Sequence, residues 1–539
     1  MTLIVAATNI QECQSRISDS PYVPALAAVA SGLLLAIPYL FPAAFILMWL
    51  AWVPLLLVIQ QHKASIVYAL GLVTGLTFYF VSGYWIVDFT ILFKGYSLLG
   101  STVGSSLIWL YSAQLPALLV LSYSVLQRRF KLPPALLFPI LTVLFFTHFP
   151  LLFPVHLGGS QSQFLIALQA IEFTGVYGLD WLIALVNMCL TLSISRHPHR
   201  FISLTASTLI VGVWLGYGYY ANTYWQAQIQ QWQPRSIGIV QPNETPTLTP
   251  TTVYSGFSKT YPPEMAMTEL LAKAGATIVV WPEAKPKSFF NTPYVAAAYR
   301  SNIKQLGITL VLQDMELATA PSLRATSSTL QRRHYNAAAA INTSGELAGH
   351  YRKIKRIPFG EMLPIIDQWP WLGITTRQYL GDFFKDIKAG NHQQVFKLDD
   401  LDIIPVICYE SLFPQFVANA ARNSQRSALI TILSNDGWFG KTIQPQQHLN
   451  VSILRAVENR LPLVHAINNG PSAAVLPNGK VVAKTDFDTA GGYLVELAVN
   501  NHKQATLFNR APGLFISCIW LAFGGLLLSS YWRRRTTST

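Results

Sequence analysis

The sequence predicts a membrane α-helical bundle of about eight transmembrane helices joined to an α/β domain. Hydrophobic residues make up 51% of the 539 residues and charged residues only 12%, whereas soluble domains carry about 25% charged residues. Apolar runs of the length that crosses a bilayer recur along the first part of the chain. Between residues 222 and 511 the composition turns polar, and β-branched runs alternate with helical patterns.

Eight apolar runs are candidate transmembrane helices. They cover residues 22–41, 43–60, 66–88, 105–126, 133–153, 176–195, 202–220 and 513–531. Prolines interrupt the run at 133–153, but neighbouring helices can satisfy the backbone groups that prolines leave free. We therefore expect three parts: a seven-helix membrane domain at 1–221, an extramembrane domain at 222–511, and a last helix with a basic tail at 512–539.

Basic residues in the short loops predict the orientation. If the N-terminus is cytoplasmic, Lys63, Arg128 and Arg196 lie in inner loops, and the C-terminal arginines 533–535 lie on the same side. The outer short loops contribute only Lys94. This asymmetry is the one that the positive-inside rule describes. We therefore expect both termini in the cytoplasm and the domain at 222–511 on the outer face, which is the periplasm in a bacterium.

Charge and cysteine usage disfavour two other classes of function. The net charge of +13 comes without a dense basic run carrying interleaved aromatic residues, so we expect no nucleic-acid binding. The four cysteines, Cys13, Cys189, Cys408 and Cys518, show no spacing typical of a disulfide framework or a zinc site. The sequence indicates no metal and no organic cofactor.

The extramembrane domain is expected to contain buried, mixed β-sheet. Apolar, β-branched runs occur at 236–241, 276–283, 308–313, 402–410, 428–436 and 461–468. Near-continuous apolar strands indicate a sheet that is covered on both faces. The turn sequences at 343–346 and 477–480 predict hairpins within it.

Three polar residues interrupt these patterns. Glu283 follows an apolar strand and a proline, Lys353 lies in the basic segment 351–364, and Cys408 ends a β-branched run. Singly, they are explained as an acid at a helix N-terminus, a residue of a solvated loop and a small core residue. Together they suit acyl transfer, because a thiol nucleophile needs a base and a tetrahedral intermediate needs a cation beside its oxyanion.

The motifs around these residues resemble those of the nitrilase superfamily. WPEA (281–284), YRK followed by PFGE (351–361) and ICYE (407–410) occur in the order and spacing of that superfamily's Glu-Lys-Cys triad. SNDGWFG and RAVENRLPLVHAINNG resemble the segments that follow its cysteine. GLVTGLTFYFVSGYWI and TGVYGLDWLIALVN, together with the predicted helices, are similar to the apolipoprotein N-acyltransferase family.

This resemblance implies an αββα sandwich facing the periplasm of a bacterial inner membrane. The implied reaction takes an acyl chain from a membrane phospholipid and moves it, through a thioester, to the N-terminal diacylglyceryl-cysteine of an apolipoprotein. Ping-pong kinetics are expected for such a reaction. Cys408 would be the nucleophile, Glu283 the general base and Lys353 the oxyanion stabiliser.

The same resemblance implies a set of supporting residues. Glu361 would orient Lys353. Tyr409 and Glu410 would line the site beside the nucleophile. Asn336, Asn435 and Trp438 would shape the pocket.

Several positions depart from the family pattern. The loop after residues 240–243 lacks the family's tryptophan, PEAKPK (282–287) carries lysines after the acid, and His465 stands where arginine is common. The Glu-Trp-Leu-Arg pattern expected around the fifth span is also absent. These departures concern acceptor recognition and lipid handling, because the triad itself is intact. The apolar stretch at 368–373 is a hypothetical entry point for lipid through Trp369 and Trp371, or else an ordinary buried loop.

Two alternative functions remain open from the sequence. A membrane-tethered amidase of the nitrilase type, or an acyltransferase for another amine, would use the same triad without a lipid cleft. A non-catalytic scaffold could retain the fold, although the intact Glu, Lys and Cys set argues against it. Release of lysolipid, or failure of a thiol-reactive lipid probe to label Cys408, would separate these functions.

Overall fold

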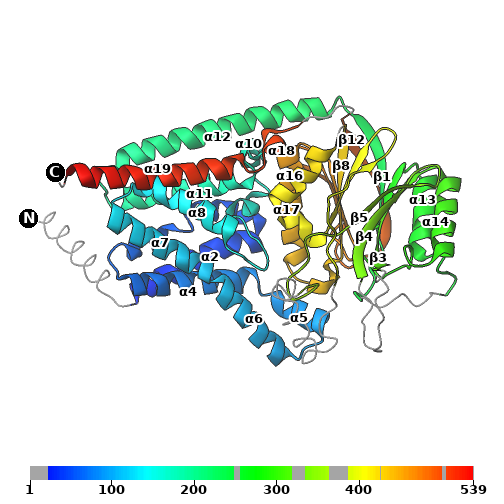
Figure 1. Ribbon diagram of the computed structural model, residues 1–539, viewed down its shortest axis with the longest axis horizontal. Helices are drawn as coiled ribbons and strands as arrows, with labels where there is room; N and C mark the ends of the chain where they lie inside the picture. The colour runs from blue at the N-terminus through cyan, green and yellow to red at the C-terminus, as the bar shows by residue number, and fades with distance from the viewer. Residues whose placement is uncertain are drawn as a thin grey trace, which may run out of the picture.

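The protein is described here from a computed structural model, which covers residues 22–247, 255–318, 334–362, 387–424, 426–500 and 505–537. A bundle of helices occupies one end of the molecule and two β-sheets the other (Figure 1). Helices α12 and α19 both run along the bundle and lead to and from the sheets (Figure 1).

The bundle is built from apolar helices. They are α2 (Val23–Leu40), η1 (Pro42–Leu50), α3 (Val53–Ile59), α4 (Ala64–Ser82), α5 (Ile86–Lys94), α6 (Leu98–Ser112), α7 (Gln114–Phe130), α8 (Pro134–His148), α11 (Val176–Ile194), α12 (Arg200–Ile229) and α19 (Leu514–Thr537). Three short helices, η2 (Leu157–Gln161), α9 (Leu165–Leu168) and α10 (Ile171–Thr174), connect α8 to α11.

Among the described residues, seven helical stretches are long and apolar enough to cross a membrane. They are 23–40, 42–59, 64–82, 98–130, 176–194, 200–229 and 514–535. The run predicted at 133–153 forms α8, which has only 15 residues. The predicted membrane-helical class is confirmed, and the fifth predicted span is a shorter apolar helix.

Two predicted boundaries differ from the helices observed. The run at 66–88 is divided, because α4 ends at Ser82 and α5 begins at Ile86. The last helix before the sheets, α12, continues unbroken to Ile229, so the expected domain boundary at residue 221 falls inside it. The last turns of α12 are polar, but the composition does not change sharply at any one residue. The sequence therefore does not mark where the membrane domain ends.

Close packing of α4 against α7 depends on two glycines one helical turn apart. A Cβ atom on Gly75 would lie 2.7 Å from the Cα atom of Ala113, and one on Gly71 would lie 2.7 Å from the Cα atom of Ala117. Small residues let the backbones of membrane helices approach closely, which is the main source of attraction between helices in lipid. The GLVTG segment therefore has a packing role.

The extramembrane part contains two mixed sheets of six strands each. The first has the order β12-β1-β2-β3-β4-β5 and the second β11-β10-β9-β8-β7-β6. The strands are β1 (Gln233–Gln241), β2 (Ile278–Val280), β3 (Thr309–Leu317), β4 (His334–Ile341), β5 (Leu347–Arg352), β6 (Phe396–Lys397), β7 (Asp402–Ile407), β8 (Ala428–Ser434), β9 (Leu463–Ile467), β10 (Ala473–Val475), β11 (Val481–Lys484) and β12 (Gly491–Val499). The predicted hairpins join β4 to β5 and β10 to β11.

Helices cover the outer face of each sheet, which confirms the αββα arrangement. One apolar core fills the space between the sheets. A second core packs α13 (Pro263–Lys273) and α14 (Pro293–Leu306) on the first sheet. A third core joins the second sheet, α16 (Pro414–Asn423) and α17 (Gln444–Asn459) to the membrane helices. The half of the molecule that contains the sheets therefore shares a continuous core with the bundle.

Candidate active site

Cys408 lies at the sharp turn between β7 and the short helix η4 (Cys408–Leu412). Its backbone has a φ of 50°, a left-handed conformation that costs a non-glycine residue of order 1–3 kcal/mol and is typical of functional sites. The strand β7 runs parallel to β8, with Ile407 opposite Leu433. The carboxyl ends of both strands therefore meet at one edge, and the thiol lies buried there.

Glu283 follows β2 on the first sheet, and a short chain of amides orients it. Asn336 Nδ2 donates to Glu283 Oε1 at 3.0 Å, and Gln313 Nε2 donates to Asn336 Oδ1 at 2.7 Å. The other carboxylate oxygen, Oε2, is buried and has no hydrogen-bond partner among the described residues. Burial raises the pKa of Glu283 to about 7, against the opposing effect of Lys353. A free, buried oxygen with this pKa suits a general base at neutral pH.

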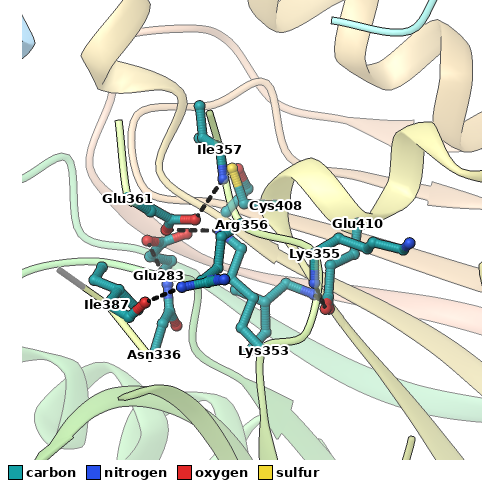
Figure 2. Close-up of polar contacts among 12 residues, drawn as sticks. Glu283, Asn336, Lys353, Lys355, Arg356, Ile357, Glu361, Ile387, Cys408 and Glu410 are labelled. Atoms are coloured by element: carbon teal, nitrogen blue, oxygen red, sulfur yellow. Dashed lines mark hydrogen bonds and ion pairs between the residues drawn. The ribbon is translucent and has the colours of Figure 1, made fainter. Parts of the chain in front are cut away.

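Lys353 follows the end of β5 and is completely buried. Its Nζ donates to Glu361 Oε1 at 2.8 Å, while Glu361 Oε2 accepts from the backbone N–H of Ile357 at 2.9 Å. Burial lowers the pKa of Lys353, but Glu361, Cys408 and Glu283 outweigh that effect and raise the pKa. The lysine therefore stays an ammonium at the centre of the site (Figure 2).

The surroundings of Cys408 keep its sulfur protonated at rest. Burial is the largest effect and raises the pKa of the thiol, and the carboxylates of Glu283 and Asp436 raise it further. The ammonium of Lys353 is the main opposing effect and lowers it. The sulfur therefore becomes a nucleophile only if a base takes its proton during attack. Among the charged groups that act on the thiol, the one with a free acceptor atom is Glu283.

Glu410 and Tyr409 support the site rather than face its centre. Glu410 Oε1 accepts from the Tyr351 hydroxyl at 2.6 Å and from the backbone N–H groups of Ile354 and Lys355 at 2.7 and 3.1 Å. Its Oε2 accepts from the backbone N–H of Ile407 at 2.9 Å. One buried carboxylate thus ties the segment after Lys353 to the residue before Cys408 (Figure 2).

The Tyr409 side chain is directed toward the membrane domain. Its hydroxyl donates to the backbone carbonyl of Leu152, and its ring packs on Phe153 with a centroid distance of 6.0 Å. Both partners belong to the connection that follows α8. The turn that carries the nucleophile is therefore fastened to the bundle.

The two remaining predicted residues lie in the loop after β8. Asn435 is buried, and its Oδ1 accepts from Asn468 Nδ2 at 3.0 Å. Trp438 packs edge-on against Phe93 of α5 at 4.9 Å. Beside it, Phe439 stacks on Phe89 of the same helix at 5.1 Å. This loop connects the catalytic edge with α5, so Trp438 contacts the membrane domain.

The departures in the sequence acquire structural explanations. Lys287, from the segment after Glu283, is buried between Glu244 and Glu264, with Nζ–Oε distances of 2.8 and 2.6 Å. His465 is fully buried, and burial lowers its pKa well below the usual range. The stretch at 368–373 lies outside the described residues.

Sequence reasoning missed four residues around the nucleophile. These are Gln313, Ser411, Ser434 and His448. Gln313 and His448 lie in patterns typical of an ordinary strand and helix, so no local signal pointed to them, whereas Ser411 directly follows the ICYE motif and Ser434 opens the SNDGWFG motif. Asp436, which binds His448, lies within the SNDGWFG motif that had been singled out for its neighbours Asn435 and Trp438.

One group among the described residues could hold a metal ion. The ligand atoms of Asp436, His448 and His465 lie within 4.8 Å of one another. Bonds of about 2.0–2.1 Å to zinc would bring such atoms to roughly 3.4 Å apart. Nδ1 of each histidine already contacts a protein atom, in Asp436 and Ser452 respectively. Asp436 also accepts from Ser434, so hydrogen bonds account for the positions of all three side chains without a metal ion.

A cavity of about 130 Å³ lies between the bundle and α17. Its wall includes the apolar side chains of Phe78, Trp85, Ile108 and Leu412, and His448 is among the polar side chains that also line it. Because Leu412 ends the helix that Cys408 begins, the cavity adjoins the turn that carries the nucleophile.

The sequence profile of the carbon-nitrogen hydrolase family matches residues 236–505. That of the apolipoprotein N-acyltransferase N-terminal domain matches residues 31–189. The two matches cover the sheets and the membrane bundle respectively.

Curated relatives carry the same combination. The chain is 28% identical to the apolipoprotein N-acyltransferase of Geobacter metallireducens, over 85% of this chain and 86% of that protein. It is 29% identical to that of Pseudomonas paraeruginosa, over 63% of this chain and 61% of that protein. Among solved structures, an amidase from Nesterenkonia sp. matches with 16% identity and a TM-score of 0.34, over 52% of this chain and 95% of that chain.

Proposed function

The chain belongs to the carbon-nitrogen hydrolase superfamily, within its apolipoprotein N-acyltransferases, and on that premise we propose that it acylates the N-terminal diacylglyceryl-cysteine of apolipoproteins. The acyl donor is a membrane phospholipid. Cys408 is the nucleophile, Glu283 the general base and Lys353 the oxyanion stabiliser. The observation that carries this proposal is that the three side chains lie close together, and that the turn with Cys408 is hydrogen-bonded to the membrane bundle.

In the first half-reaction, Glu283 Oε2 takes the proton of the Cys408 thiol as the sulfur attacks the ester carbonyl of the phospholipid. The charge that develops on the carbonyl oxygen lies near the fixed ammonium of Lys353, where it is stabilised without reorganisation. The carbon–oxygen bond breaks, and the lysophospholipid alcohol leaves with the proton from Glu283. A thioester on Cys408 remains.

In the second half-reaction, the free α-amino group of the diacylglyceryl-cysteine attacks the thioester carbonyl. Glu283 accepts a proton from the attacking nitrogen, and the carbon–sulfur bond breaks. An amide is released, and the Cys408 sulfur takes back a proton. Because donor and acceptor use one site in turn, the kinetics are ping-pong.

A lipid substrate requires the site to lie near the bilayer. Phe89 and Phe93 of α5 contact the loop after β8, and Leu152 of the bundle accepts the Tyr409 hydrogen bond. The nucleophile is thus held close to the membrane helices. From the basic loops we infer that the site lies on the periplasmic side of a bacterial inner membrane, with both termini in the cytoplasm.

The test uses the full-length protein in vesicles that contain phosphatidylethanolamine. We expect release of lysolipid in an amount equal to the enzyme, an acyl adduct on the Cys408 peptide by mass spectrometry, and turnover when a diacylated lipopeptide with a free N-terminus is added. Cys408→Ala should abolish all three, whereas Cys518→Ala, on the last membrane helix, should abolish none. A native enzyme that hydrolyses small amides but forms no acyl adduct from phospholipid would instead identify an amidase.

A further inference from the structure

A closed ring of polar contacts begins at the Cys408 side chain and returns to its backbone. Ser434 donates its one hydroxyl proton to Asp436 Oδ1 at 2.7 Å, so its oxygen can only accept from the Cys408 thiol that it contacts. Asp436 Oδ2 lies 2.9 Å from His448 Nδ1, and His448 Nε2 lies 2.8 Å from Ser411 Oγ. Ser411 Oγ donates to the carbonyl of Cys408 at 2.9 Å. The last four residues are nearly or completely buried.

The protons of this ring can be counted. A serine hydroxyl has one proton to donate, and Ser411 directs it to the Cys408 carbonyl. The contact between Ser411 and His448 is then a hydrogen bond only if His448 Nε2 carries a proton. An ionised carboxylate only accepts, so the contact with Asp436 requires a proton on His448 Nδ1 as well. All contacts are satisfied when His448 is an imidazolium.

The charges at the catalytic edge favour the same state. Lys353 is already paired with Glu361, so Asp436 is left as an additional carboxylate near Glu283 and the thiol. Its charge raises the pKa of both, which opposes formation of a thiolate. An imidazolium against Asp436 would cancel that charge within the ring.

We propose that His448 is a positioning residue for the nucleophile of the proposed function: it carries a proton on both ring nitrogens, neutralises Asp436, and through Ser411 holds the backbone of Cys408 in its left-handed turn. It does not touch the reacting atoms. The inference rests on the proposed role of Cys408, and it adds a residue outside the Glu-Lys-Cys set.

The other ionisable nitrogen groups that face His448 have partners of their own. The titratable groups that face it in the described part of the chain are His465 from β9, Arg455 from α17, and, across the cavity, Tyr39 from α2, Tyr79 from α4 and His156 from the connection before η2. His156 binds Asp180 at 2.7 Å, Arg455 binds Glu458 at 3.0 Å, and His465 contacts Ser452 at 3.0 Å. Asp436 is therefore the carboxylate that His448 neutralises.

The experiment measures the alkylation of Cys408 by iodoacetamide in the full-length protein, by quantifying the Cys408 peptide as a function of pH. Glutathione added to the same reaction serves as the reference thiol, because Cys518 lies on the last membrane helix. His448→Gln leaves Asp436 without its cation, so the pH midpoint of alkylation should rise and the rate at neutral pH should fall about tenfold per unit of rise. His350→Gln, at a half-buried histidine bound to Glu316, should leave the midpoint unchanged.

Two further variants separate charge neutralisation from simple structural support. Asp436→Asn removes the charge itself, so Cys408 should stay as reactive as in the native protein. Asp436→Asn with His448→Gln should recover most of the reactivity lost in His448→Gln. The proposal is overturned if His448→Gln keeps the native midpoint, or if the double variant is as slow as His448→Gln. Failure of the proposed function would appear separately, as a native enzyme whose Cys408 reacts with iodoacetamide but never with phospholipid.

Discussion

The ammonium of Lys353 and the carboxylate of Glu361 form a buried ion pair with an N–O distance of 2.8 Å, and their side chains are only 0% and 7% exposed. The second oxygen of Glu361 binds the backbone N–H of Ile357. Glu361 therefore performs two tasks: it keeps Lys353 charged, and it shapes the loop that follows the lysine. A cation fixed in this way can stabilise an oxyanion without first being reorganised.

Replacing Glu361 by Gln should leave the lysine charge uncompensated in a buried site. Removing one partner of a buried ion pair costs about 3–5 kcal/mol, so we expect a large fall in thermal stability and loss of thioester formation. The matched control is Glu316→Gln, which breaks the partly exposed pair of Glu316 on β3 with Arg352 on β5, across the intervening strand β4. Equal losses for both variants, measured by thermal unfolding and lysolipid release, would contradict this role for Glu361.

The rate of thioester formation should follow the ionisation of Glu283. Burial raises its pKa to about 7, and only the carboxylate form can accept the thiol proton. The rate should therefore rise with pH through about 7 and fall about tenfold for each pH unit below that value. Lysolipid release in a single turnover, measured as a function of pH, tests this directly. A rate that stays constant through this range would exclude Glu283 as the base.

Asn336 should affect the pH below which the rate of thioester formation falls. Its hydrogen bond to Glu283 favours the charged carboxylate and lowers the pKa. Asn336→Ala should therefore raise the pKa of Glu283. The fall in rate should then begin at a higher pH, and the reaction at neutral pH should be slower than in the native protein. Asn291→Ala is the control, because Asn291 bonds to the backbone at the exposed end of β3. The idea fails if both variants keep the native pH profile.

Glu410 should be more important for stability than its neighbour Tyr351, although the two are hydrogen-bonded. Glu410→Gln places an amide donor against a backbone donor and loses charged hydrogen bonds worth about 1.5–3 kcal/mol each. Tyr351→Phe removes only one of the four donors that Glu410 accepts. In thermal unfolding, the melting temperature of Glu410→Gln should be well below that of Tyr351→Phe, and both should be below that of the native protein. The reverse order would show that the carboxylate does not join the two loops.

A second buried pair should fasten the catalytic domain to the bundle. Arg460 is 1% exposed and binds both oxygens of Glu172 on α10 at 2.9 Å. Glu172→Gln should lower stability by about 3–5 kcal/mol, whereas Glu172→Leu combined with Arg460→Met should recover much of it, because apolar groups can replace a buried pair. Breaking the exposed pair of Glu269 and Lys273 by Glu269→Gln should leave the melting temperature unchanged. A double variant less stable than Glu172→Gln would contradict this prediction.

The sequence determined the class of the protein and the residues of its three motifs. The low fraction of charged residues, together with the long apolar runs, predicts a membrane bundle. The hairpins at 343–346 and 477–480 are predicted by turn residues that act over only four positions. Glu283 and Cys408 were recognisable because each polar side chain ends an apolar strand. These signals are local, so a sequence pattern can carry them.

Only the tertiary structure decided how those residues are held. The binding of Glu410 to segments on both sides of the site, the pairing of β12 with β1, and the contact of His448 with Asp436 and Ser411 depend on packing between distant parts of the chain. Periodicity reports which face of an element is buried, but it does not report which buried polar groups will meet. Histidine 448 lies in an ordinary amphipathic helix, and its importance arises from the strand ends against which that helix packs.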